Sequence, residues 1–152
     1  MTRAKPADSP FSNALRRALR YLSRAPKTVK QMQQYLAQKA VDPDTAEEVI
    51  TRLLEERYLD DTQFAAWYIE SRVRTKPRSV FALGYELHQK GVPQQISESL
   101  LQGYQDEELA LKAVEKMIKR WQGLPAETFQ KKLTNYLRYR GFSYRICRFV
   151  ED

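Results

Sequence analysis

The sequence predicts an all-α protein made of three tandem three-helix repeats that form an elongated, curved helical array. Apolar residues make up 42% of the chain and charged residues 30%. The chain has 5 glycines and 7 prolines, which are too few for a turn-rich β protein. A short block also recurs at a spacing of about fifty residues, the sign of a repeat architecture. Units this small need neighbours to be stable, which favours end-to-end packing over the competing arrangement, one globular bundle of nine helices.

The recurring block is typical of the end of a helix. Its three copies are LAQKAV at 36–41, LHQKGV at 87–92 and LRYRGF at 137–142. The glycine allows the left-handed conformation of a helix stop, the cation suits the negative end of the helix dipole, and the next apolar residue closes the turn. Ala40 replaces glycine in the first copy. We therefore expect that stop to be strained or to use a different turn.

The residues before and after each stop complete a three-helix unit. A second helix carries an apolar pair spaced i, i+4 before the stop, and a third helix follows it. Pro26, Pro77 and Pro125 mark the end of each first helix. The predicted organisation is a disordered lead-in at 1–12 and repeats at 13–57, 58–103 and 104–152. The apolar pairs of the second helices are Met32 with Leu36, Leu83 with Leu87, and Leu133 with Leu137.

Capping signals support several of these helix starts. Thr28 with Gln31 fits a capping box, in which each side chain bonds the backbone of the other. Asp60 with Gln63 fits a second box at the start of the next repeat, flanked by an apolar staple of Leu59 and Phe64. Two third helices have their own cap candidates, Asp42 before Pro43 and Ser143 after Phe142.

Composition argues against several classes of protein. Charged or polar residues interrupt each apolar patch, so no membrane span of about 18 residues is expected. The N-terminus lacks the apolar core of a secretory signal, which makes a cytoplasmic location the expectation. Cys147 has no second cysteine to pair with, and His88 is the single histidine, so we expect no metal and no cofactor. An inert, partly buried thiol is the simplest interpretation of Cys147.

A net charge of +7 favours an acidic partner. Four cations fall within residues 72–78, where the first helix of the second repeat ends, and cations occur at the same junction of the other repeats. Such a surface suits a phosphate backbone or the acidic patches of a protein, although a merely solvated helix face is the alternative. The candidate partner- or DNA-binding residues are Arg20, Arg24, Lys27, Arg72, Arg74, Lys76, Arg78, Lys90, Lys119, Arg120, Arg138, Arg140 and Arg145.

Two other functions receive weaker support. Three-helix units resemble helix-turn-helix modules, but the second helix of the middle repeat offers few groups that could read bases. Asp60 and Asp61 would have to carry any enzymatic chemistry. Asp60 is already needed as a cap, and neighbouring helical residues do not face each other. We therefore predict that the chain is not an enzyme and has no catalytic residues.

Three segments resemble the RecX family, the regulators of the RecA recombinase. LLEERYLDDTQFA at 53–65 and ELHQKGV at 86–92 are similar to the central signature of the family, and LRYRGF at 137–142 is similar to its closing motif. The resemblance covers residues 13–150. The chain departs from the family pattern at Ala40, and at residues 75–77 (TKP), where the family usually carries glycine.

The resemblance implies a protein that has no catalytic activity of its own. A monomer without membrane association is our expectation from the sequence itself, because no heptad pattern indicates self-association and no apolar run is long enough to span a membrane. The resemblance also implies binding to RecA and to the RecA–ssDNA filament, with inhibition of strand exchange and ATP hydrolysis, and hence a role in DNA repair, recombination and the SOS response. The alternative is a helical repeat protein that binds DNA independently of sequence and without RecA. Its affinity would fall steeply with salt.

Overall fold

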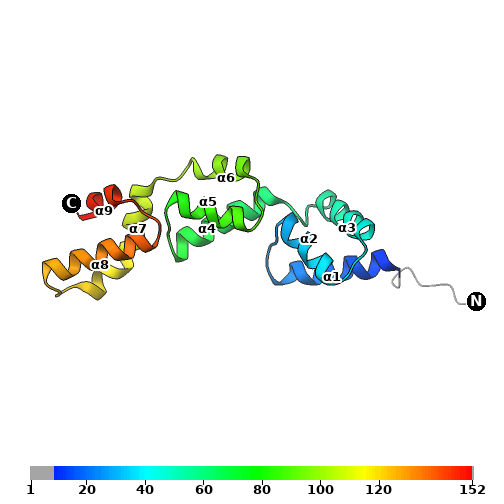
Figure 1. Cartoon of the computed structure of the whole chain (residues 1–152), viewed down its shortest axis with the longest axis horizontal. Coiled ribbons are helices and arrows are strands. Elements are labelled where there is room, and N and C mark those ends of the chain that lie inside the picture. The colour runs from blue at the N-terminus through cyan, green and yellow to red at the C-terminus, as the bar shows by residue number, and fades with distance from the viewer. Residues whose placement is uncertain (1–8, 152) are drawn as a thin grey trace, which may run out of the picture. The chain divides into compact units, whose positions relative to one another are not determined.

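The computed structural model describes residues 9–151, and within this range the chain forms nine α-helices and no strands, arranged as tandem three-helix repeats (Figure 1). The all-α fold class is therefore confirmed. Two compact units are present, one of residues 9–64 with 90–93 and one of residues 65–89 with 94–151. The helices are α1 Pro10–Arg24, α2 Val29–Gln38, α3 Pro43–Glu55, α4 Asp61–Thr75, α5 Val80–Gln89, α6 Gln94–Leu101, α7 Asp106–Trp121, α8 Ala126–Tyr139 and α9 Tyr144–Glu151.

The first repeat has its core between α1, α2 and α3. The predicted pair on α2 is fully buried, and α1 and α3 each contribute one stripe of core residues, as amphipathic helices require. Leu59, from the segment between α3 and α4, completes this core. The Thr28–Gln31 capping box and the Asp42 cap are confirmed. The buried core consists of Ala14, Ala18, Met32, Leu36, Val49, Ile50, Leu53 and Leu59.

The N-terminal segment before the first helix is shorter than predicted. α1 begins at Pro10, and the backbone N–H of Ser12 donates to Ser9 Oγ at 3.0 Å. Serine and proline are common in disordered segments, but a serine cap followed by proline at the first helical position is a helix start. The prediction of a lead-in up to residue 12 is therefore wrong for its last residues. Its remainder, residues 1–8, lies outside the described residues.

The second unit contains the third repeat and the middle repeat from residue 65 on, except for residues 90–93. α7, α8 and α9 enclose the core of the third repeat, where Leu133, Leu137, Phe142 and Ile146 are buried. Trp121 closes this core at the end of α7, with its ring edge-on to Tyr136 at 5.5 Å between centroids. The Tyr136 hydroxyl donates to the carbonyl of Ala113 at 3.1 Å. Tyr136 therefore helps to pack this core and satisfies its hydroxyl there.

The helix stops share one conformation, including the copy that lacks glycine. Gly91 and Gly141 have φ values of 92° and 90°, and Ala40 adopts φ 58°. The backbone N–H of Val41 donates to Leu36 O at 3.0 Å, as Phe142 does to Leu137 O. Of the two outcomes expected for Ala40, the strained stop is the one observed, because a left-handed backbone costs roughly 1–2 kcal/mol for a residue with a Cβ.

Successive repeats are joined by a polar contact that the stop sequence helps to form. At the first joint, Thr28 Oγ1 donates to Lys90 O at 2.6 Å, and the backbone N–H of Val29 donates to Asp61 Oδ1 at 3.0 Å. A Cβ on Gly91 would lie 2.4 Å from the Cβ of Lys30. Glycine is thus needed here for close approach as well as for its backbone conformation.

The second joint repeats this arrangement at equivalent positions. Ser79 N–H donates to Arg140 O at 3.1 Å, and Val80 N–H donates to Asp106 Oδ1 at 2.8 Å. A Cβ on Gly141 would lie 2.5 Å from Ser79 Oγ. Both cap residues, Thr28 and Ser79, are 0% exposed. The joint therefore satisfies backbone N–H groups that would otherwise be buried without partners.

The joint residues are absent from both ends of the repeat series. Pro10 and Ala40 occupy the first-repeat positions that correspond to the aspartate and the glycine, while Phe129 occupies the third-repeat position of the cap hydroxyl. Phe129 lies inside α8 and packs edge-on against Trp121. The middle repeat thus has both halves of the joint, whereas the first and third repeats each lack one half.

Candidate partner-binding surface

The thirteen predicted cations fall into a group held by internal contacts and a group that extends into solvent. Seven are half-buried or lie against carboxylates, carbonyls and aromatic rings. The charge at each junction is therefore only partly available to a partner. Two of these seven, Arg138 and Arg145, are nevertheless exposed. The remaining six are exposed as well and consist of Arg20, Arg24, Arg74, Lys76, Lys119 and Arg120.

Two cations of the middle junction belong to an ion-pair network. Arg72 Nε lies 3.2 Å from Glu86 Oε1, and Arg78 Nε lies 3.6 Å from Glu86 Oε2. The hydroxyl of Tyr68 donates to Glu86 and accepts from Arg72 Nε. Burial, followed by the Glu86 hydrogen bond, raises the pKa of Tyr68. The network fastens α4 to α5, so Arg72 and Arg78 are structural residues first.

Arg74 and Lys76 are the exposed cations of the same junction. They lie outside the Glu86 network, and the backbone carbonyls of Arg74 and Thr75 accept hydrogen bonds from Lys116 Nζ at 3.4 and 3.0 Å. Lys116 thereby supplies positive charge to the end of α4, where the helix dipole is negative. The side-chain charge of Arg74 and Lys76 is available to an anionic partner.

The first junction combines cations with stacked tyrosines. Tyr21 and Tyr35 stack with ring centroids 4.0 Å apart, and Lys27 Nζ lies 4.5 Å above the Tyr21 ring. Arg20 and Arg24 extend from the last turns of α1 into solvent. Cation–π contact holds Lys27 in place at the edge of this exposed pair.

In the third repeat the arginines near the closing motif have internal partners. Arg140 lies 4.0 Å above the Tyr136 ring, and Arg138 lies 4.2 Å from the Tyr144 ring centroid and donates to Phe142 O at 3.1 Å. Arg145 pairs with Glu107 at 3.2 Å. A backbone hydrogen bond, together with that from Arg145, lowers the pKa of Glu107. Lys119 and Arg120 remain the exposed cations at the end of α7.

Lys90 lies at the first joint, where its carbonyl accepts the Thr28 hydroxyl. Its side chain is half-buried. A cation recurs at this position of the stop because positive charge interacts favourably with the end of a helix. The backbone carbonyl of Lys90 forms part of the first joint. A direct role of Lys90 in partner binding stays a prediction.

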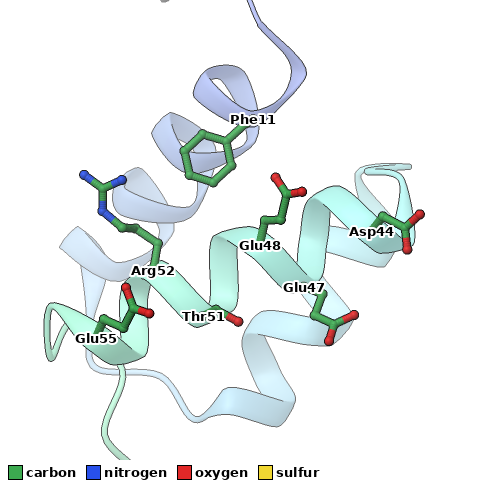
Figure 2. A pocket seen from close by; sticks show the side chains of 7 residues that line it. All are labelled: Phe11, Asp44, Glu47, Glu48, Thr51, Arg52 and Glu55. Atoms are coloured by element: carbon green, nitrogen blue, oxygen red, sulfur yellow. The ribbon is translucent and has the colours of Figure 1, made fainter.

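The hollow between α1 and α3 has the opposite charge. Figure 2 shows that Asp44, Glu47 and Glu48 of α3 line it, with Phe11 on the α1 side. The nearby Arg52 already pairs with Glu56 at 2.7 Å. Because carboxylates dominate, this face of the first repeat repels a phosphate backbone, and an anionic partner must approach another face.

The residues considered for catalysis have structural roles. Asp60 Oδ1 accepts from the backbone N–H groups of Thr62 and Gln63, which confirms it as a cap, and Asp61 serves the first joint. Cys147 is 1% exposed, and burial raises the pKa of its thiol. Over residues 9–151, no cluster of three His, Cys, Asp or Glu side chains is placed to bind a metal, and no helix is long and apolar enough to cross a membrane.

Sequence reasoning missed an exposed aromatic pair on α5. Phe81 is 80% exposed and Tyr85 58% exposed. They lie one helical turn apart on the side of α5 opposite the buried Leu83 and Leu87. An alignment of the three second helices would have revealed them, because the fold buries other positions of the same helix.

Comparison with known proteins decides the family. Models of the first, second and third RecX three-helix domains match residues 14–53, 60–101 and 105–150. The chain belongs to the RecX family. A relative from Prosthecochloris aestuarii, regulatory protein RecX, is 36% identical over 96% of both chains. Regulatory protein RecX of Streptococcus gordonii is 34% identical over 88% of this chain and 52% of that protein, so the chain spans about half the length of several curated RecX relatives.

Solved RecX structures have the same fold. The crystal structure of RecX from Lactobacillus salivarius superposes with a TM-score of 0.77 at 26% identity, covering 93% of this chain and 94% of the other. The three family models coincide with the three copies of the sequence repeat, and the match includes α4 and α5, which carry the Glu86 network. Membership of a family of regulatory proteins thus rests on the whole repeat series.

Proposed function

We propose that this chain binds RecA and the RecA–ssDNA filament and inhibits strand exchange and ATP hydrolysis, thereby modulating DNA repair and recombination. Family membership over all three repeats carries the proposal. The surface supports it, since exposed cations recur where the first helix of each repeat ends. A filament that repeats its own subunits along a polyanion is a partner to which such recurring charge is matched.

Direct binding to DNA without a recombinase is the second candidate, and the exposed junction cations favour it equally well. The two differ in what sets the affinity. If the chain binds only phosphates, its affinity falls steeply with salt and is the same with or without RecA on the DNA. If it binds the filament, its affinity also depends on contacts with the surface of RecA. Titration of labelled single-stranded DNA at two salt concentrations, with and without RecA, separates them. Binding that is equally tight without RecA rejects the filament proposal.

Charge reversal at the middle junction tests which surface is used. The double variant Arg74→Glu and Lys76→Glu changes two exposed side chains and leaves the Glu86 network intact. We expect inhibition of the filament to require roughly tenfold more protein, because like charges then face an acidic partner. Reversing Arg72 or Arg78 is unsuitable, because a glutamate at either position would repel Glu86 and destabilise the fold.

The matched control is Lys131→Glu with Lys132→Glu on α8. It changes the net charge by the same amount, and Glu127 precedes Lys131 by four residues just as Glu70 precedes Arg74. Its inhibition curve should stay close to that of the wild type. Equal loss in both variants would mean that total charge, and not the middle junction, determines binding.

A further inference from the structure

The exposed face of α5 differs from the same face in the other two repeats. Met32, Leu83 and Leu133 occupy equivalent buried positions on α2, α5 and α8. Two residues before them stand Lys30, Phe81 and Lys131, and two residues after them stand Gln34, Tyr85 and Asn135. All six are exposed. The repeat therefore folds with polar side chains at these positions, and the fold does not require the aromatic pair of the middle repeat.

Such an aromatic pair exposes apolar surface to water and gains little internal packing in return. Phe81 is 80% exposed, an unusual environment for phenylalanine, and Tyr85 follows it one turn later. His88, also exposed, extends the same face. Side chains spaced i, i+4 and i+7 are the anchors by which a helix occupies a groove on another protein.

Buried side chains and ion pairs hold α5 in place on the faces that do not carry Phe81 and Tyr85. Leu83 and Leu87 are 0% exposed, and Glu86 ties the adjacent face to Arg72 of α4 and to Arg78 in the following loop. An anchor that is already fixed loses little conformational entropy on binding. The Glu86 network thus prepares the α5 face for contact.

The charge of α5 distinguishes a protein partner from a nucleic acid. Among Val80–Gln89 there is no lysine or arginine, although the chain contains 26 of them. Aromatic platforms for single-stranded nucleic acids need cations alongside to neutralise the phosphates. The corresponding helices α2 and α8 carry Lys30, Lys131 and Lys132, so cations were possible here.

We infer that Phe81 and Tyr85, with His88 at the edge, anchor α5 in an apolar groove on a protein partner. The inference rests on the proposed function, which makes the recombinase that partner. Two aromatic side chains bury roughly 300–500 Å² between them, well below the ~1,200 Å² of a stable protein interface. A dimer of this chain formed through α5 alone would therefore not be stable. The anchor therefore fits a partner that also contacts residues of this chain outside α5.

The test transplants the residues of the first repeat. In Phe81→Lys with Tyr85→Gln, α5 receives the side chains that α2 already carries on a folded helix. The thermal midpoint should not fall, because both side chains are exposed. Affinity for the RecA–ssDNA filament should drop at least about tenfold, as for buried aromatic anchors elsewhere. Lys30→Ala with Gln34→Ala is the matched control and should keep the affinity.

The possible outcomes separate this inference from the proposed function. Wild-type protein that binds filaments, with a variant that binds equally well, overturns the anchor and leaves the proposed function standing. Wild-type protein that ignores filaments overturns both. A variant that loses affinity for naked single-stranded DNA by the same factor makes α5 a nucleic-acid platform and overturns the inference. A free wild-type protein that sediments as a dimer, with a variant that sediments as a monomer, overturns it as well.

Discussion

Single residues show why the stop motif has glycine in two repeats and alanine in one. Gly91 and Gly141 need both a left-handed backbone and the absence of a Cβ, because the preceding repeat packs against them. Ala40 needs only the backbone conformation. The left-handed stop could be predicted, since the pattern around it is local. The close approach could not, because Lys30 and Ser79 lie far from these glycines in the chain.

Two opposite changes at the stops test this explanation. Ala40→Gly should raise the free energy of unfolding by about 1 kcal/mol, because it removes the strain of a left-handed alanine. Gly141→Ala should lower it by about 2 kcal/mol or more, since the new Cβ adds the same strain and meets Ser79 and Ala82. Urea denaturation measures both.

Gly103→Ala is the control for these variants, because a Cβ there meets no heavy atom closer than 3.9 Å. It should change stability by no more than about 0.5 kcal/mol. If Gly141→Ala were as harmless as Gly103→Ala, the second joint would not have this close-packed geometry.

At the scale of the helices, the contact that best shows how the repeats are joined is made by an aspartate at the start of a first helix. Asp61 and Asp106 accept the N-terminal N–H of the second helix in the preceding repeat. The caps within a repeat could be predicted because cap and helix adjoin in sequence. The joints could not, since Val29 and Asp61 are 32 residues apart and Asp61 resembles part of a local acidic pair.

The ionisation of Asp61 gives the first joint a pH dependence. Burial, with the nearby charge of Asp60, raises the pKa of Asp61 in the folded state, although the Val29 hydrogen bond acts in the opposite direction. A raised pKa means that the folded protein holds this proton more tightly than the unfolded chain. The stabilising contribution is therefore present in acid and is lost as the pH rises through the folded pKa.

Two variants at Asp61 separate charge from hydrogen bonding. Asp61→Asn keeps an oxygen that accepts from Val29, so its stability relative to wild type should increase as the pH rises through the pKa of the Asp61 carboxyl in the folded protein. Asp61→Ala leaves the Val29 N–H without an acceptor and should lower stability by about 1 kcal/mol at neutral pH. Unfolding measured between acid and neutral pH would contradict this role of Asp61 if the Asn variant lost stability relative to wild type with rising pH.

For the whole molecule, the repeat explains both what could be predicted and what could not. The all-α tandem fold could be predicted because helix stops, caps and apolar stripes recur in phase. The candidate surface could be predicted only in part. Charge density located the junction at 72–78, but the Glu86 network that holds Arg72 and Arg78 depends on how α4 meets α5. The aromatic pair on α5 could have been found by aligning the three second helices, because Leu83 and Leu87 mark the buried face and the pair lies opposite to it.

The repeats are also specialised by position. The first carries the acidic hollow lined by α3 and the middle one carries Phe81 and Tyr85, while the first and third lack one half of the joint. Shared positions therefore maintain the fold, and positions that differ between repeats are candidates for function. On this basis we propose that the α5 face contacts the partner, in addition to Arg74 and Lys76, which we propose on the separate ground of their exposed charge.

The central claim is that the chain acts on the recombinase filament, and ATP hydrolysis by that filament tests it most directly. Preformed RecA filaments on single-stranded DNA hydrolyse ATP at a steady rate that can be followed while the protein is added. We predict that the rate falls as the protein approaches stoichiometric amounts, and that Arg74→Glu with Lys76→Glu shifts the curve to higher concentration. A rate that stays unchanged with excess wild-type protein would contradict the claim.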